Sequence, residues 1–170
     1  MSYIDLYLNK EPMIISPNEE GDLTATIFGV PFDSTHSYKP GSRFGPDAIR
    51  TAFNNIEIFH PELGVDLESV GIEDLGNTKH TADVHEMTNM VSKLTSELSN
   101  KDRLLAILGG EHSLTYGAYM GLPKDTGFVV FDAHYDLRDS YADLSLSHAA
   151  FLRRGAGPRR PRGRPPGAGP

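Results

Sequence analysis

The stretch from Phe128 to Asp136, Phe-Val-Val-Phe-Asp-Ala-His-Tyr-Asp, decides how the rest of the chain is interpreted. Its first four residues are aromatic or β-branched and uncharged, which is typical of a strand buried on both faces. Asp132, His134 and Asp136 follow at every second position. If the extended backbone continues, alternation places these three side chains on one face. Such a group is costly unless a cation or a proton network compensates it, and a divalent metal ion is the simplest compensation.

Outside this stretch, apolar runs alternate with helical periodicity. We expect strands over residues 24–30, 70–75, 104–108 and 127–131, and helices over residues 46–53, 83–99 and 113–120, with a last helix starting within 147–154. Strands separated by helices imply βαβ units, and therefore an α/β fold with a mainly parallel sheet. Ligands of such sheets bind beyond the carboxyl ends of the strands.

A second strand end carries a further candidate ligand. The strand over 104–108 runs into Gly109-Gly110-Glu111-His112-Ser113, whose glycines permit a sharp turn. His112 would then face the ligands that follow residue 131. Imidazole and carboxylate ligands without sulfur suit Mn²⁺, with Zn²⁺, Fe²⁺ or Co²⁺ as other possibilities. The alternative is that Asp132 caps a turn and the histidines are ordinary polar residues.

Length and composition limit the class of protein. A chain of 170 residues is long enough for one domain with a core, and it has no cysteine, which excludes disulfides, thiolate metal sites and a cysteine nucleophile. The net charge of −7 argues against general nucleic-acid binding. We see no secretory signal and no apolar run of membrane-spanning length, so a cytoplasmic protein is expected.

The last sixteen residues, 155–170, differ from everything before them because they contain only Gly, Ala, Pro and Arg. Such a composition cannot pack and resists helix and strand. We therefore divide the chain into residues 1–154 and a Gly/Pro/Arg-rich tail, 155–170. The tail is interpreted as disordered or non-native sequence; the alternative is a basic arm that binds an anionic partner such as RNA.

Four motifs together resemble the ureohydrolase (arginase/agmatinase) family. They are Gly-Gly-Glu-His-Ser at 109–113, Phe-Asp-Ala-His-Tyr-Asp at 131–136, Gly-Val-Pro-Phe-Asp at 29–33 and Pro-Gly-Ser-Arg-Phe-Gly-Pro-Asp-Ala-Ile-Arg at 40–50. The resemblance runs from about residue 24 to residue 154 and is nearer to microbial agmatinases than to arginases. It implies a three-layer α/β/α arginase-like fold with two Mn²⁺ ions, and relatives commonly form homo-oligomers.

The resemblance also implies a role for each site residue. By motif position, His112 and Asp136 would bind one metal ion, His134 the other, and Asp132 would bridge both. His148 resembles the proton-shuttle histidine of the family, although it could equally be an ordinary histidine at a helix start. Glu111 would support the metal ligands rather than bind metal itself.

The implied reaction is hydrolysis of a linear guanidino compound by a metal-bridging hydroxide, most simply agmatine to putrescine and urea, a step of polyamine biosynthesis. The alternatives are an arginase, another guanidino-acid ureohydrolase, or an inactive fragment of such an enzyme. The chain departs from the family pattern because the later Asp-x-Asp metal motif is absent and the length is about half of the usual. Residues 1–154 would then be an N-terminal half whose sheet ends on an unpaired edge, which invites aggregation.

The remaining polar residues are interpreted as structural. Arg43 is expected to pair with an acid and fix its loop, and Asp139 and Asp143 are expected to be solvated loop acids. No role is assigned to the histidines at other positions, His36, His60, His80 and His85.

Overall fold

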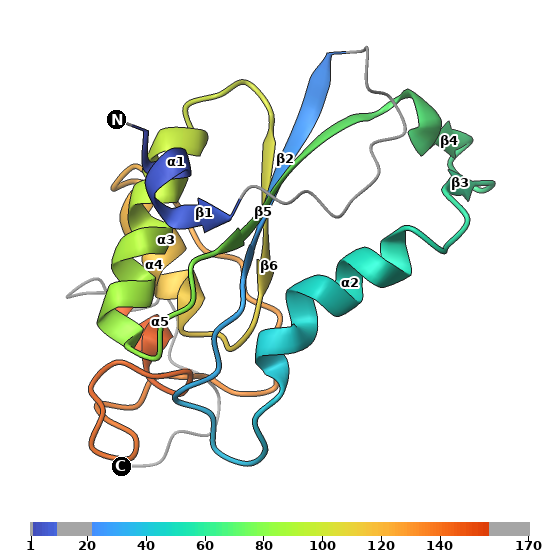
Figure 1. Ribbon diagram of the computed structural model, residues 1–170. Coiled ribbons are helices and arrows are strands. Elements are labelled where there is room, and N and C mark those ends of the chain that lie inside the picture. Colours follow the sequence, from blue (N-terminus) through green and yellow to red (C-terminus); the bar gives the residue numbers. More distant parts are fainter. Residues whose placement is uncertain (1, 10–21, 157–170) are drawn as a thin grey trace.

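The computed structural model describes residues 2–9 and 22–156 and is built on a four-stranded sheet (Figure 1). Its strand order is β1 (Leu8–Asn9), β5 (Gly71–Thr78), β2 (Leu23–Val30) and β6 (Leu104–Gly109). β2 pairs in parallel with both β5 and β6, and only β1 is antiparallel to its neighbour, β5. The prediction of an α/β fold with a mainly parallel sheet is therefore confirmed.

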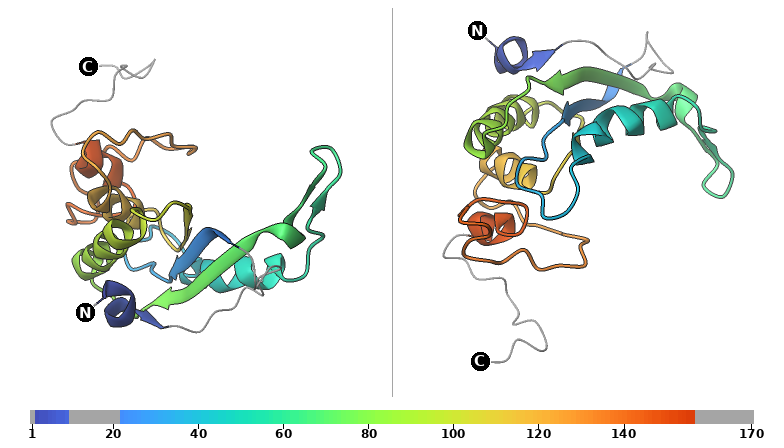
Figure 2. Two further views of the ribbon diagram at one scale, coloured as in Figure 1. Left: turned by 90° about the horizontal axis from the view of Figure 1, so that it is seen from above. Right: turned by 60° about the horizontal axis from the view of Figure 1, so that its bottom comes forward.

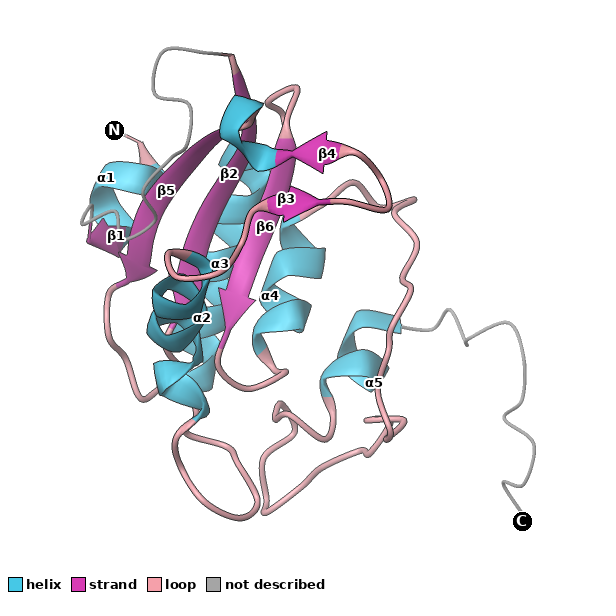
Figure 3. Cartoon of the chain, turned by 90° about the vertical axis from the view of Figure 1, so that its right-hand side faces the viewer, coloured by secondary structure: helices cyan, strands magenta, loops and turns pink. Residues whose placement is uncertain are grey.

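Helices cover both faces of the sheet. α2 (Gly45–Phe53) lies on one face, while α3 (Val84–Leu98) and α4 (Leu114–Gly121) lie on the other (Figures 2 and 3). The expected three layers are thus present. α1 (Tyr3–Tyr7) contacts α3, and α5 (Phe151–Ala156) contacts α4. Short elements complete the fold: η1 (Ser42–Phe44), the antiparallel pair β3 (Phe59–His60) and β4 (Val65–Asp66), and η2 (Leu67–Ser69).

The main core forms between the sheet and α3. The predicted helical repeat places one apolar stripe against β2 and β5, and its members are buried: Val84, Met87, Val91, Leu94 and Leu98. Phe28, Val30 and Leu75 meet this stripe from the sheet. Alternation along a parallel strand and the 3.6-residue helical period therefore produce the same core that the sequence predicts.

The other face of the sheet is fixed by a buried arginine. Arg50 of α2 has no exposed surface and donates two hydrogen bonds of 2.8 Å to the two carboxylate oxygens of Asp74 in β5. It also donates to Asn77 Oδ1 at 2.6 Å and to the carbonyl of Gly76 at 3.0 Å. A Cβ on Gly29 would lie 2.9 Å from Arg50 Nη1, so a side chain there would push the guanidinium out of place.

The predicted strand over residues 127–131 is wrong. Among the described residues, the sheet ends at β6 on that side, and residues 127–131 form no strand. Val129 is 83% exposed and Phe131 95% exposed, whereas Phe128 packs against Tyr119 with ring centroids 4.3 Å apart. The run has the composition of a buried strand, but composition alone does not pair a backbone, and in the described part of the chain residues 127–131 do not join the free edge of β6.

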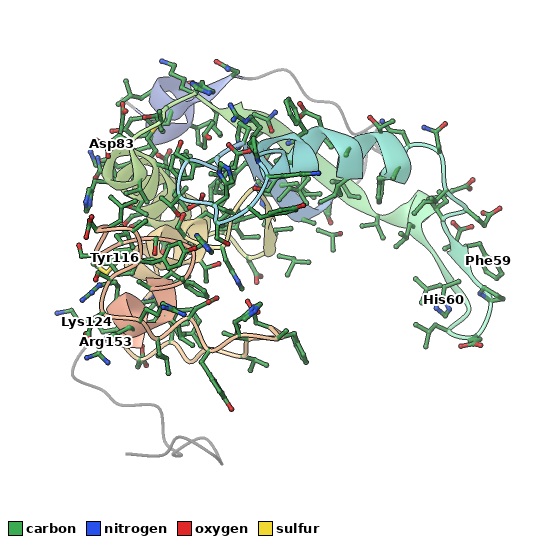
Figure 4. All side chains as sticks on the ribbon, turned by 90° about the horizontal axis from the view of Figure 1, so that it is seen from below. Phe59, His60, Asp83, Tyr116, Lys124 and Arg153 are labelled. Carbon is green, nitrogen blue, oxygen red and sulfur yellow. The ribbon has the colours of Figure 1, made fainter. Side chains whose placement is uncertain are left out.

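Several short elements were not predicted. α1 and β1 fall in the weakly patterned first residues, and β3 and β4 have two residues each, too few to show alternation. Figure 4 shows Phe59 and His60 on this hairpin, away from the body of the molecule. Residue 147 is a bend and residues 148–150 are a turn, so the last helix begins at Phe151, within the predicted range 147–154. It continues to Ala156, two residues into the segment 155–170 whose composition predicts no helix. The tail from residue 157 onward lies outside the described residues. In the described ranges we find no helix of the length and apolarity needed to cross a bilayer.

Candidate metal centre

The first ligand is positioned by a close approach of two backbones. Gly110 N donates to Val30 O at 3.0 Å, and Glu111 N donates to Phe32 O at 2.8 Å, so the chain leaving β6 stays paired with the chain leaving β2. A Cβ on Gly110 would lie 2.0 Å from the Phe32 carbonyl oxygen, which only glycine avoids. This turn delivers His112 at the carboxyl end of the sheet, where the sequence predicts a ligand.

His112, Asp132 and Asp136 converge on one point. One potential ligand atom from each lies within 4.8 Å of the others. His112 Nδ1 is 2.8 Å from Asp132 Oδ2 and 3.9 Å from Asp136 Oδ2, and the His112 ring packs on Phe151 of α5 at 4.3 Å. An imidazole and two carboxylates at this spacing form a group that could hold a divalent ion.

His134 does not share this face, so the predicted alternation fails. Its side chain is 83% exposed, and its Nδ1 lies 3.6 Å from Asp132 Oδ1. The backbone bends at Ala133 and His134 and is left-handed at Asp136, where φ is 46°, so it is not extended from Asp132 to Asp136. This turn, rather than extended alternation, brings Asp136 to Asp132 and His112. The two oxygens of Asp132 thus face different imidazoles, Oδ2 toward His112 and Oδ1 toward His134.

The two carboxylates have opposite electrostatic surroundings. The hydrogen bond from His134 N, supported by the His112 imidazole, lowers the pKa of Asp132 despite some desolvation. Burial, followed by the negative charge of Asp132, raises the pKa of Asp136. A cation between them would favour the ionised form of both, which fits the donor set of the group.

Glu111, next to His112 in sequence, is buried in hydrogen bonds of its own. It is buried and accepts hydrogen bonds from Thr35 N at 2.7 Å, from Ser113 Oγ at 2.6 Å and from the Thr35 hydroxyl. The Thr35 oxygen in turn accepts from His148 N at 3.0 Å and lies 3.3 Å from His148 Nδ1. Glu111 is not part of the ligand group, and it connects the turn after β6 to His148 through Thr35.

Two cavities adjoin at the candidate centre. The smaller, of about 340 Å³, contains the ligand group and is lined by His36, Lys39 and Ser42 on its other side. The larger, of about 600 Å³, is lined by Tyr135, Arg138 and Tyr141. His134, Asp136 and His148 border both cavities. A small molecule in the larger cavity would therefore lie beside both the ligand group and His148.

Residues around the ligand loop hold it in place. Asp136 O accepts from Arg153 N at 3.4 Å, and Arg138 N donates to Ala149 O at 3.2 Å. Asp139 pairs with Arg153 at 2.5 Å and is mostly exposed. Asp143 is an exposed loop residue with φ of 61°. The expectation that both acids lie in the loop, outside the ligand group, is confirmed.

Asp33 organises the loop that covers the smaller cavity. It is 3% exposed and accepts from Gly41 N at 2.7 Å, while its two oxygens lie 2.9 and 3.0 Å from Arg43 Nε. Arg43 thus has the structural role that the sequence predicts. Burial acts to raise the pKa of Asp33, but the hydrogen bonds from Gly41 and Arg43 outweigh it and lower the pKa below its ordinary value.

We expect Asp33→Asn to destabilise the protein at neutral pH and much less in acid. Because the folded-state pKa of Asp33 is lowered, its stabilising effect is fully present above the unfolded-state pKa of about 3.9 and is lost as the pH falls through the folded-state value. Urea unfolding of wild type and Asp33→Asn from neutral pH to about pH 3 measures this. A difference in unfolding free energy that stayed constant over this range would contradict the assignment.

Comparison with known proteins identifies the family. The sequence model of the Arginase family matches residues 23–162. An N(1)-aminopropylagmatine ureohydrolase of Thermococcus kodakarensis is 43% identical over 131 residues, covering 75% of this chain and 45% of that protein. An agmatinase of Pyrococcus horikoshii is 40% identical over 136 residues, covering 78% and 47%. The crystal structure of an agmatine ureohydrolase of Thermoplasma volcanium superimposes with a TM-score of 0.79 at 37% identity, covering 86% of this chain and 50% of that one.

The chain belongs to the arginase family, and its fold is arginase-like. It spans about half the length of these relatives. The predicted family and fold are confirmed, and the site residues occupy the region that the family match covers.

Proposed function

We propose that this protein hydrolyses a linear guanidino compound, agmatine or N(1)-aminopropylagmatine, to urea and an amine. The observation that carries the proposal is the group His112, Asp132 and Asp136 beside a cavity of about 600 Å³. The names of two relatives, 43% and 40% identical, favour these substrates over arginine.

The donor set fits a manganese centre. Imidazole and carboxylate without sulfur are ligands that suit Mn²⁺. His112 and Asp136 would hold one ion, Asp132 would bridge, and His134 would hold a second; the support is that the two Asp132 oxygens already face His112 and His134 separately. When bound, the ions supply a hydroxide at neutral pH, which the resonance-stabilised guanidinium carbon requires as nucleophile.

The residues of this chain have the remaining tasks. His148 borders both cavities and would give a proton to the leaving amine, for which an imidazole is suited near neutral pH. Tyr135 and Tyr141 would receive the substrate chain in the larger cavity. Holding the substrate between the ligand group and His148 removes much of the entropic cost of bringing the reacting groups together.

Urea release tests the proposal. A polypeptide that continues over the full length of the relatives, incubated with Mn²⁺, is expected to release urea from agmatine or N(1)-aminopropylagmatine and less from arginine. Chelation of the metal should abolish the release. No urea from any of the three compounds would overturn the proposal.

The same assay on the 170-residue chain addresses the alternative that this chain alone is inactive. The exposed edge of β6 and the exposed residues Val129 and Phe131 favour that alternative, because the sheet and the site are open on this side. Metal binding without urea release by the 170-residue chain, together with release by the longer polypeptide, would establish it.

A further inference from the structure

Thr35 lies where the buried carboxylate of Glu111 meets the candidate proton carrier. Its side chain is 6% exposed, and its hydroxyl oxygen has three neighbours: Glu111 Oε1, the backbone N–H of His148 and His148 Nδ1. The loop over residues 31–41 and the turns before α5 bring these partners together, although Thr35 and His148 are 113 positions apart in sequence.

The three neighbours determine which hydrogen bonds the Thr35 hydroxyl donates and which it accepts. A threonine hydroxyl has one proton to donate and two lone pairs to accept with. A carboxylate accepts only, so the short contact between Thr35 and Glu111 takes the hydroxyl proton. Ser113 Oγ donates to the same Glu111 oxygen and leaves this arrangement unchanged.

Both remaining neighbours must then donate to Thr35. The backbone N–H of His148 is a donor by its chemistry, and it takes one lone pair at 3.0 Å. His148 Nδ1, at 3.3 Å, can hydrogen-bond to the other lone pair only if it carries a proton. In the neutral imidazole the lone pair is then at Nε2, the nitrogen on the other side of the ring.

We propose that Thr35 is a positioning residue, which fixes His148 in the tautomer with a proton on Nδ1 and directs proton transfer to Nε2. The significance for catalysis rests on the proposed function, in which His148 protonates the leaving amine. In that step the proton leaves Nε2 of the imidazolium for the amine nitrogen, and the Nδ1 proton stays on the ring, held by Thr35. Without the hydroxyl the ring could rotate or carry its proton on the wrong nitrogen.

The tautomer is measured directly by ¹⁵N NMR of the histidine side chains in the metal-free 170-residue chain. In alkaline buffer, where imidazole is neutral, the ¹⁵N shifts distinguish a protonated from an unprotonated Nδ1. The His148 signals among the seven histidines are assigned by their loss in His148→Asn. We expect a protonated Nδ1 in wild type and in Thr35→Ser, and loss of this preference in Thr35→Val.

The chain offers a matched control for the loss of a buried hydroxyl. Thr95 of α3 is 1% exposed, and its hydroxyl has no hydrogen-bond partner among the described residues. Thr95→Val makes the same chemical change in a buried threonine without touching His148. It should leave the His148 tautomer as in wild type.

Steady-state kinetics of a polypeptide with the full length of the relatives provide a second test of the role of Thr35. Thr35→Val should lower kcat by about 10- to 100-fold, a part of the usual contribution of general acid–base catalysis, with little change in KM. Thr35→Ser should restore most of kcat, because the serine hydroxyl can make the same hydrogen bonds.

The outcomes separate the two proposals. An unprotonated Nδ1 in wild type, or an unchanged tautomer in Thr35→Val, would overturn the role of Thr35; if Thr35→Val does not fold, the wild-type spectrum decides alone. The expected tautomers without urea release from wild type would support the role of Thr35 while removing the proposed function.

Discussion

Asp136→Asn should lower the affinity of the chain for Mn²⁺ by about 100-fold or more, because even changes in residues that only orient a ligand often cost about 10- to 100-fold. Asp136 contributes one of the three converging ligand atoms. Asparagine is the sharpest substitution, since it tolerates the left-handed backbone at this position, where φ is 46°. Alanine would add backbone strain to the loss of the ligand. Titration calorimetry, or the electron paramagnetic resonance signal of free Mn²⁺, measures the affinity.

Asp143→Asn is a matched control for this experiment. Asp143 also has a left-handed backbone, with φ of 61°, and lies in an exposed loop outside the ligand group. The substitution removes the same charge from the same kind of backbone position. If Asp136→Asn and Asp143→Asn reduced Mn²⁺ affinity equally, the assignment of Asp136 as a ligand would fail.

Arg50→Met should destabilise the protein by about 3–5 kcal/mol, the usual effect of removing one partner from a buried ion pair. The methionine fills part of the space, but Asp74 keeps a buried charge without its two 2.8 Å hydrogen bonds, and Asn77 Oδ1 also loses its donor. Because Arg50 connects α2 to β5, we expect the unfolding transition in guanidinium chloride to move to lower concentration.

Two further variants test the cause of this effect. Arg103 pairs with Glu73 of β5 at 2.9 Å, but both side chains are partly exposed. Arg103→Met should therefore lower the free energy of unfolding by about 1 kcal/mol or less. The double variant Arg50→Met/Asp74→Leu removes both charges and should be more stable than Arg50→Met alone. If Arg50→Met and Arg103→Met lowered the free energy of unfolding equally, burial would not explain the contribution of the Arg50–Asp74 pair to stability.

The sequence predicts those elements whose own pattern is sufficient. β2 and α3 lie within one or two residues of their predicted bounds, because a β-branched run and a 3.6-residue apolar repeat are local signals. The run before Asp132 shows the limit of such signals. Phe131 has the composition of a core residue yet is 95% exposed, since a strand exists only where another strand accepts its hydrogen bonds.

The sequence also predicted only part of the candidate site. His112, Asp132 and Asp136 meet because parallel strands direct their carboxyl ends to one edge, a rule that residue types and spacing reveal. The direction of His134 was not predictable, because the chain bends at Ala133 and His134 instead of continuing as an extended strand. Thr35 was missed altogether: a threonine in a loop rich in small polar residues carries no sign that it will contact a histidine far along the chain.

The lack of sheet pairing before Asp132 has a consequence for how an ion would act. His112 and Asp132 are separated by 20 positions that include α4, and the loop after α4, residues 122–131, makes no sheet pairing among the described residues. An ion bound by both residues would cross-link the loop, so part of its binding free energy would be used to reduce the conformational entropy of the loop. A measured dissociation constant would therefore report chain ordering as well as coordination. Packing that ordered this loop would tighten metal binding without changing a single ligand.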